Sequence, residues 1–495
     1  MQRIVSMTDR EKIAHLLRRF GLGVIPEELE ALEKLGVDGA FQFLLNFEAT
    51  DEGFDISPWE LCWEEGLTDI YVDPYRSAGW WTLRMIMTAR PMQEKLTLFW
   101  HNHFAMSGTK VEVGPMMIQY LDILRKKGLG KFDDLLGSVS FCPAMLVWLD
   151  AGQNQKGSPN ENFAREVMEL FTLGIGNYTE KDVQEAARAF TGWSIRLLVL
   201  EPGAENFQKN AKEFVAAGKP LFTYAYSPEV HDDGPKTIFS ETKSWTSQDV
   251  LTTLAAKPET ARYLAKKLWS FFAYENPEPE VIERLAKVYI SSGHQIKPML
   301  VEIYKSPEFW SDKCVRKQVK SPVDFTYTIG RQLGIGYYLK TLRTKDASPM
   351  KLVAKPFRDI AGAMFGLTLQ QGMMILFLPD VSGWKWGTNW ISSEAMLKRS
   401  SMGPLIMGAE SKDYGGAGAL VARMVVKGKP ANAAEMTDRF LAVFDGDLPA
   451  EKRAILLKVC EDGGGPKCLS SPKEAAPVLA EMCKLLFSSP EFQFC

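Results

Sequence analysis

Three of the five histidines lie in segments that also carry amide or acidic side chains. They are His101, His103 and His231, and with Glu166 or Glu169 they would supply the imidazole and carboxylate ligands that divalent metals such as zinc use. On one continuous helix, side chains two positions apart point about 200° apart. His101 and His103 could therefore share an ion only if a helix ended beside them, as a nearby glycine would allow. We regard a divalent metal as a candidate cofactor, with His101 and His103 as its ligands.

A pair of glutamates offers acid–base chemistry instead. Asn162, Glu166 and Glu169 have i, i+4 and i+7 spacing, which places them on one face of a helix. Two neighbouring carboxyl groups can divide into a protonated acid with a raised pKa and an ionised base, as in glycoside cleavage. We therefore predict Glu166 and Glu169 as catalytic groups or ligands, and His231 as a catalytic proton carrier or a further ligand.

The same residues also fit a structural interpretation, in which they form ion pairs along helices. Structural ion pairs outnumber catalytic sites, so this alternative stays open. The pairs with suitable helical spacing are Glu161 with Arg165, Arg165 with Glu169, and Glu185 with Arg188.

Other polar and aromatic residues in these segments are candidates for binding. Lys236 ends a loop that starts at His231, and loops often carry function, although the Asp-Gly within it is an ordinary turn signal. Trp384 opens an aromatic loop that could stack on a sugar or a peptide, or could simply anchor the loop. The full set of predicted binding residues is Asn160, Asn162, Arg165, Lys236 and Trp384.

These segments avoid core composition, and a buried charge without a partner is strongly disfavoured. We therefore expect the chemically capable side chains to meet in one cluster. Its members would be His101, Arg165, Glu166, Glu169 and His231.

Helices must position these residues. The tetrapeptide Ser-Pro-x-acid combines an N-cap, a proline at the first helical position and a capping-box acid, and it occurs at 57–60, 158–161, 321–324 and 471–474. Four helix starts of one design predict a mainly α, large multi-helix globular fold. In the second of them, Ser158 would cap a helix that Gly174 ends, and Thr179 would cap the next helix.

One region departs from the helical pattern. Residues 222–226 alternate in polarity, a turn follows, and residues 237–239 could return as the second strand. We expect one small β-hairpin insert at about 195–245. The insert would lie within a helical domain of residues 1–410, followed by a C-terminal helical extension of residues 411–495.

Composition narrows the function classes. The formal net charge of −3 gives no general attraction to nucleic acid or to an anionic membrane, and the apolar runs are too short to span a bilayer. The seven cysteines show no Cys-x-x-Cys spacing. No signal peptide precedes the first helical pattern, which predicts a cytoplasmic protein. Nucleophile-elbow, phosphate-loop and dinucleotide motifs are missing from the sequence.

Several long segments resemble the bacterial family catalogued as domain of unknown function 1800. The resemblance implies little about chemistry, because that family has no established activity. It does imply that relatives are often exported and often encoded beside proteins of the alkaline-phosphatase superfamily, which are therefore candidate partners. Relatives tend to end near the aromatic loop, so residues 411–495 would be an extension. The segments that carry the resemblance are 101–104, 160–174, 190–193, 231–236 and 381–384.

Two functions remain in view. The favoured one is a hydrolase-like enzyme that acts on an envelope or extracellular polymer through the Glu and His groups. The alternative is a non-catalytic scaffold or binding protein whose polar cluster only fixes the fold.

Overall fold

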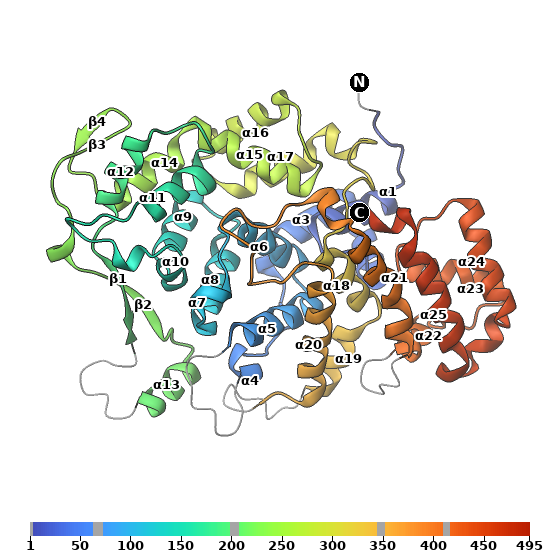
Figure 1. The fold of residues 1–495 in the computed structure, drawn as a ribbon. Coiled ribbons are helices and arrows are strands. Elements are labelled where there is room, and N and C mark those ends of the chain that lie inside the picture. The colour runs from blue at the N-terminus through green and yellow to red at the C-terminus, as the bar shows by residue number, and fades with distance from the viewer. Residues whose placement is uncertain (1–2, 63–72, 199–206, 344–351, 409–415) are drawn as a thin grey trace.

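The computed structural model describes residues 3–62, 73–198, 207–343, 352–408 and 416–495. It is 65% helical, with two small antiparallel sheets of two strands each within these residues. The predicted mainly α fold is therefore confirmed (Figure 1). No helix of the described part is long and apolar enough to cross a membrane.

The first ten helices form the centre of the molecule and one of its flanks. Among them α6 is the most enclosed, because every one of its side chains is buried. These helices are α1 (Asp9–Phe20), α2 (Pro26–Glu33), α3 (Gly36–Leu45), α4 (Pro58–Cys62), α5 (Pro74–Met87), α6 (Pro91–His103), α7 (Gly108–Val111), α8 (Gly114–Lys127), α9 (Phe132–Ser140) and α10 (Pro143–Trp148).

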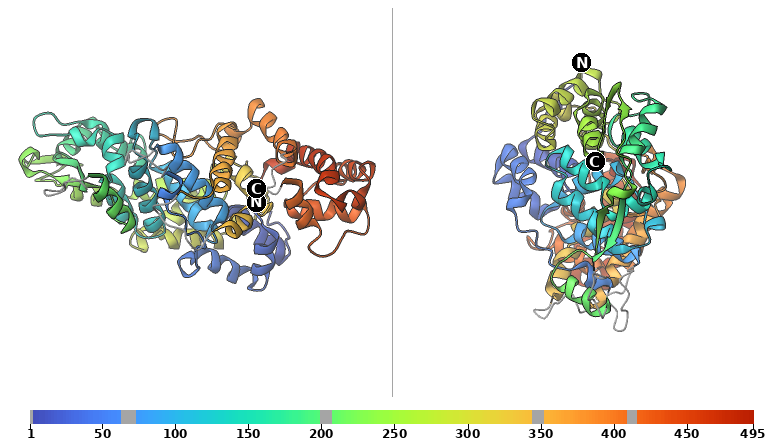
Figure 2. Two further views of the ribbon diagram at one scale, coloured as in Figure 1. Left: turned by 90° about the horizontal axis from the view of Figure 1, so that it is seen from below. Right: turned by 90° about the vertical axis from the view of Figure 1, so that its left-hand side faces the viewer.

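A second group of helices carries the small sheets at one end of the elongated molecule (Figure 2). It begins with α11 (Glu161–Glu166), which continues directly into a π-helical turn at Val167–Thr172. The others are α12 (Glu180–Ala189), α13 (Phe207–Ala216), α14 (Ser247–Ala256), α15 (Pro258–Phe272), α16 (Pro279–Ser291) and α17 (Ile296–Lys305).

The strands pair differently from the expected hairpin. Strand β2 (Phe222–Tyr226) pairs with β1 (Trp193–Leu197), whereas β3 (Lys236–Ile238) pairs with β4 (Glu241–Lys243). The prediction that 222–226 pairs with 237–239 was wrong. The reason is that 231–236 is held against the end of α12 by side-chain hydrogen bonds, which leaves β3 to turn back on the residues that follow it. Residues 199–206 of the predicted insert lie outside the described part.

Of the remaining helices, the first three pack against α5 in the middle of the molecule and the later ones form its opposite end (Figure 1). Their central contact is between α21 and α25, where a Cβ at Gly403 would lie 2.5 Å from the Cβ of Cys483, so only glycine permits this approach. The helices are α18 (Pro322–Gln332), α19 (Ile335–Leu342), α20 (Lys355–Leu369), α21 (Ser393–Gly408), α22 (Gly416–Met424), α23 (Ala433–Val443), α24 (Ala450–Asp462) and α25 (Pro472–Ser488).

Helix α1 is clasped by residues from the far end of the chain. The Arg18 guanidinium donates to both oxygens of Asp445 at 2.6 and 2.8 Å. The Arg19 guanidinium lies 3.6 Å from the sulfur of Cys495, whose backbone N–H donates to the carbonyl of Gln318 at 2.8 Å. The predicted boundary at residues 410 and 411 falls in 409–415, outside the described residues, and the division into two domains stays a prediction.

Helix starts follow the predicted capping chemistry with one exception. Capping boxes are present at Thr8, Thr179 and Ser321, because each needs only a side chain and an acid three residues apart. The predicted cap at Ser158 was wrong. Asn160 caps α11 instead, by accepting a hydrogen bond from the Asn162 backbone N–H at 2.9 Å.

Candidate functional site

His101, predicted as a metal ligand, uses both of its ring nitrogens within the protein. Its Nε2 accepts from the backbone N–H of Leu376 at 3.1 Å, so Nδ1 carries the proton and lies 3.3 Å from the Tyr120 hydroxyl. Burial lowers the pKa of His101 to about 3, which keeps the ring neutral. These contacts position the loop at Leu376 against α6.

His103 points to a different part of the core, because α6 continues through it and ends only at Phe104. Its Nε2–H donates to the Phe171 carbonyl at 3.1 Å, and its Nδ1 is buried without a partner. Burial and the nearby Lys267 ammonium hold the pKa of His103 well below its usual value. Within the described residues no three His, Cys, Asp or Glu side chains are grouped as metal ligands. Metal binding by His101 and His103 stays a prediction.

The two predicted catalytic glutamates are neighbours beside the π-helical turn. Partial burial and the charge of Glu169 raise the pKa of Glu166. Glu169 accepts a hydrogen bond from the Tyr178 hydroxyl. Such wide turns often occur at functional sites. The pair is therefore the most acid–base-like arrangement among the predicted residues.

Arg165 does not pair with Glu169, contrary to the predicted i, i+4 pair. It contacts both oxygens of Glu180 at 2.7 Å and Glu161 at 3.3 Å. The competing partners explain the difference, because Glu180 binds the Arg165 guanidinium through both oxygens and Glu169 accepts from Tyr178 instead. The predicted binding residue Arg165 thus links the starts of α11 and α12.

Asn160 and Asn162 hold the loop that precedes α11. The amide of Asn160 donates to the Asp150 carbonyl at 3.4 Å, and that of Asn162 to the Leu149 carbonyl at 3.3 Å. Trp384 lies against α6, where its backbone N–H donates to the Asn102 side chain at 2.7 Å and its ring is 5.6 Å from that of His101.

The loop from His231 to Lys236 is tied to the end of α12. The Nδ1–H of His231 donates to the Thr191 carbonyl at 2.9 Å, and Arg188 binds Asp232 at 2.7 Å. Lys236 is buried, donates to the Gly234 carbonyl at 2.9 Å and has its pKa lowered by burial. Among the described residues no hydrogen bond or ion pair joins His101, Glu166 and His231. The predicted cluster is divided into three groups with separate partners.

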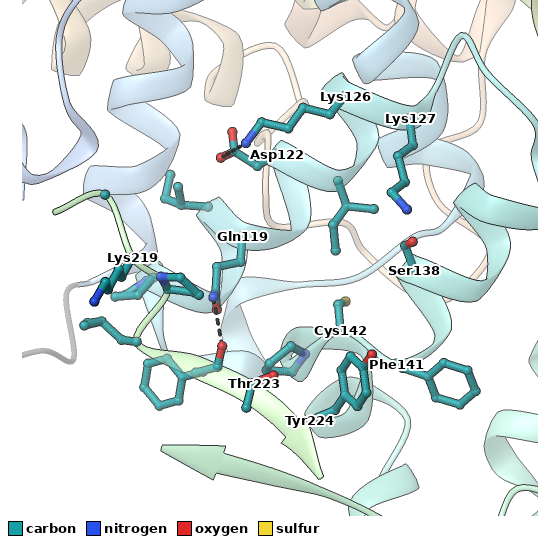
Figure 3. A pocket seen from close by; sticks show the side chains of 18 of the residues that line it. Gln119, Asp122, Lys126, Lys127, Ser138, Phe141, Cys142, Lys219, Thr223 and Tyr224 are labelled. Carbon is teal, nitrogen blue, oxygen red and sulfur yellow. Dashed lines mark hydrogen bonds and ion pairs between the residues drawn. The ribbon is translucent and has the colours of Figure 1, made fainter. Parts of the chain in front are cut away.

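A cleft of about 840 Å³ lies elsewhere, between α4, α5, α8, α9, the start of α10 and β2 (Figure 3). None of the predicted site residues lines it. Its lining combines hydroxyl, amide, charged and aromatic side chains from helices that are distant in the sequence. The lining includes Ser77, Gln119, Asp122, Lys126, Lys127, Asp133, Ser138, Phe141, Cys142, Lys219 and Tyr224.

Two polar atoms of the cleft lining are buried without a hydrogen-bond partner among the residues that the structure describes. Gln119 donates its side-chain N–H to the Phe222 carbonyl at 2.9 Å, but its Oε1 has no partner (Figure 3). Ser77 is 1% exposed, and its Oγ also lacks a partner. Buried polar atoms are nearly always satisfied in proteins, so these two point to a ligand or ordered water in the cleft.

Some of the charged side chains that line the cleft form ion pairs within the protein. Lys126 pairs with Asp122 at 3.2 Å, and the His294 ring nitrogen lies 2.8 Å from Asp133. By contrast, Lys127 and Lys219 have no carboxylate within ion-pair distance among the described residues. Lys127 therefore stays available to a ligand, and Lys219 is held only by a cation–π contact with the Phe214 ring at 5.5 Å.

Nucleophilic chemistry has little support in the cleft. Burial raises the pKa of the Cys142 thiol to about 12, which keeps it protonated at neutral pH. Phe141 and Tyr224 add aromatic surface instead. The arrangement suits hydrogen bonding and ring stacking with a polar ligand.

Sequence comparison assigns the family. The family model described as "Protein of unknown function (DUF1800)" matches residues 15–494. The chain belongs to this family. No curated protein and no solved structure matches it. The DUF1800 match includes both the helical domain and the extension that we predicted as separate units.

Sequence reasoning missed the cleft of this DUF1800 chain for a physical reason. Ser77 and Gln119 lie in helices α5 and α8, whose neighbouring residues look like ordinary core. Only the tertiary arrangement shows that their polar atoms have no partner. The one local signal was aromatic alternation in 222–226, which we interpreted only as a strand.

Proposed function

We propose that this chain binds an extended polar polymer, of the kind found in cell envelopes, in the cleft between α8, α9 and β2. The observation that carries the proposal is the pair of buried, unpartnered atoms, Ser77 Oγ and Gln119 Oε1, in an open cleft of about 840 Å³. A polymer hydroxyl or amide would satisfy these atoms once the two side chains rotate towards the cleft, because both atoms are shielded from solvent in the free protein. Binding sites combine such sparse polar groups with apolar walls, here Phe141 and Tyr224.

The proposal favours a binding protein over an enzyme at this position. Three carboxylates line the cleft, Asp122, Asp133 and Asp134. Lys126 engages Asp122 and His294 engages Asp133, which leaves Asp134 without a second free carboxylate for paired acid–base catalysis among the described lining residues. An extended polymer rather than a small molecule is supported by the extent of the cleft, whose lining runs from α4 and α5 past α8 and α9 to β2.

A steric block tests the proposal. Ser138 lies on α9 at the cleft, so Ser138→Trp should fill the cleft, whereas Ser138→Ala should leave it open. We would measure retention of each protein on insoluble envelope polysaccharide and on immobilised peptide polymers. We expect wild type and Ser138→Ala to bind alike and Ser138→Trp to bind at least about tenfold more weakly. Equal binding of all three proteins, or no binding by wild type, would overturn the proposal.

A second candidate function is hydrolysis of a polymer by Glu166 and Glu169. The observation that favours it is the raised pKa of Glu166 beside Glu169, which Tyr178 holds by a hydrogen bond. Glu166 would be the protonated acid and Glu169 the ionised base. His231 would act as proton carrier only if the chain moved, because its contacts lie with Thr191.

Hydrolysis is tested by the release of reducing ends from the same polysaccharides. Activity in wild type that falls at least about a hundredfold in Glu166→Gln and Glu169→Gln would support this second function. If wild type releases nothing while it still binds, hydrolysis is rejected and the binding proposal stands. Binding to a protein of the alkaline-phosphatase-like superfamily and a cytoplasmic location stay predictions.

A further inference from the structure

One face of the β1–β2 hairpin carries a row of aromatic side chains. Trp193 lies opposite Tyr226, and Ile195 opposite Tyr224, and directly opposed residues project to the same face of an antiparallel pair. Tyr224 is 51% exposed and Tyr226 43% exposed, which is unusual for two large rings two positions apart on one strand. Their Cα atoms are roughly 7 Å apart along the strand.

The row begins inside the cleft. Phe141 and Tyr224 line the cleft, and the Phe141 ring stacks on Trp193 at 4.2 Å between centroids. Trp193 then contacts Tyr224 at 5.5 Å and Tyr226 at 5.0 Å. Its indole N–H donates to the Ser247 hydroxyl at 2.9 Å, which fixes the central ring. The aromatic surface is therefore continuous with the cleft and held by a rigid member.

The row ends at His231. Its ring lies 5.5 Å from that of Tyr226. Because Nδ1 carries the proton that is donated to the Thr191 carbonyl, Nε2 is an acceptor. No partner for this nitrogen is present among the described residues. The row thus finishes in a hydrogen-bond acceptor on a half-buried ring, in a loop that Arg188 and Asp232 hold in place.

We propose that the polymer is a glycan, and that its chain runs from the cleft over Tyr224 and Tyr226 to His231. This inference rests on the proposed binding function and names its ligand class. Sugar rings present C–H faces that stack on aromatic side chains, and hydroxyls that suit Gln119 Oε1, Ser77 Oγ and His231 Nε2. Each feature along the path has a counterpart in a glycan chain.

A peptide fits these features less well. Peptides that bind to sheets add a strand at an edge, through main-chain hydrogen bonds. Here the distinctive surface is the face of the hairpin, with its rings exposed, and not an edge. The geometry therefore favours repeated ring stacking over strand addition.

Chain length gives the sharpest test. We would titrate soluble cello-, chito- and manno-oligosaccharides, from dimers to octamers, into the full-length protein by calorimetry. Wild-type affinity for at least one series should rise with length as the chain passes beyond the cleft. Tyr226→Ala and His231→Ala should weaken binding of the longest oligosaccharides by about threefold to tenfold and leave the shortest unchanged.

Matched variants separate stacking from folding. Tyr226→Phe keeps the ring and should retain wild-type affinity. Tyr337→Ala removes a ring that is 58% exposed on α19, towards the other end of the molecule, and should change nothing (Figure 1). Melting curves of the Tyr226 and Tyr337 variants should coincide with wild type within about 2 °C, because these rings are exposed. His231→Ala also loses the hydrogen bond to Thr191, so its binding is compared only at temperatures where its own melting curve shows it folded.

The outcomes distinguish a glycan path over β2 from polymer binding in the cleft, on which it rests. If Tyr226→Ala binds long and short oligosaccharides like wild type, the path over the hairpin is rejected. If peptide polymers bind and respond to Ser138→Trp while no glycan does, the glycan class is rejected and cleft binding stands. If no ligand responds to Ser138→Trp, both fail.

Discussion

Helix α6 and the cleft both bury polar side chains, but they differ in whether the polar atoms have hydrogen-bond partners. On α6, Glu94 accepts from the Trp81 indole and the Arg125 guanidinium at 2.8 Å each, and both nitrogens of His101 are engaged. In the cleft, Ser77 Oγ and Gln119 Oε1 are equally shielded from solvent but have no partner. His103 Nδ1 on α6 also lacks one, in a site walled by aromatic rings.

The difference shows that a chemically capable side chain can contact a ligand only if its polar atoms are not already hydrogen-bonded within the protein. A histidine or glutamate whose hydrogen bonds are all made within the protein stabilises the fold and has nothing left for a ligand. A serine or glutamine with an unused buried atom destabilises the free protein and gains most from a ligand. Whether a buried polar atom has a hydrogen-bond partner is therefore a better guide to function here than the type of residue.

The largest expected effect is at Glu94. Two carboxylates bind the Arg125 guanidinium at 2.8 Å, and Glu94 is the fully buried one, whereas Glu52 is the other. Glu94→Gln would remove the charge of the buried partner and should lower the free energy of unfolding by about 3–5 kcal/mol. Urea unfolding followed by circular dichroism measures this. Glu180→Gln, which alters the exposed partner of Arg165, is the control and should unfold like wild type. An effect at Glu94 as small as that at Glu180 would show that the buried hydrogen bonds of α6 do not stabilise the fold more than an exposed ion pair does.

His101→Ala should come next, with a loss of about 2–4 kcal/mol. The substitution leaves a buried cavity and the Leu376 N–H without an acceptor. The loss should be the same with and without a chelator, and elemental analysis of wild type should find no stoichiometric metal. A chelator that lowers the melting temperature of wild type but not of His101→Ala would instead support the predicted metal site.

A pair of serines sharpens the comparison further. Ser77 and Ser140 both have buried hydroxyls without a partner, but only Ser77 lines the cleft. Alanine at either position should leave stability unchanged or raise it by up to about 1 kcal/mol, because an unsatisfied group is removed. Only Ser77→Ala should weaken polymer binding, by about threefold to tenfold. Equal binding by both variants would show that Ser77 is not used by the ligand.

The smallest effect concerns Glu166 and depends on pH. A carboxyl whose pKa is raised on folding binds its proton more tightly in the folded protein, so it destabilises the fold above that pKa and is relieved as pH falls towards its ordinary value of 4.5. Glu166→Gln should therefore melt about 1 °C above wild type at neutral pH, and this advantage should vanish near pH 4. A variant that melts lower than wild type at neutral pH would show that the Glu166 charge has a partner.

Local sequence patterns predicted the helices well, because caps depend on neighbours in the chain. Thr179 and Ser321, both predicted as caps, each meet an acid three residues later and form a capping box with it. The miss at Ser158 has a local cause, since Asn160 competes for the same role and is closer to the helix. The mainly α class follows from such signals.

Pairings between distant segments could not be predicted in the same way. The partner of β2 is β1, and the two strands are joined through α13 rather than by a tight turn. The cleft depends on Ser77, Gln119 and Tyr224 coming together from three elements, none of which has a local signature for it. The helical spacing of His101 and His103 did indicate that they face apart, and they do, since α6 ends only after His103.

The clasp on α1 sets an order on synthesis. Arg18 reaches its partner Asp445 across 427 residues, and Arg19 contacts Cys495. As the chain emerges from the ribosome, Arg19 can already pair with the carbonyls of Phe272 and Ala273 once those residues are made. The Arg18 guanidinium stays in water until Asp445 has been added. A chain cut short before Asp445 keeps Arg18 unpaired and cannot bury this residue of α1 without a penalty of several kcal/mol. Helix α1 of such a chain would therefore stay more open to proteases.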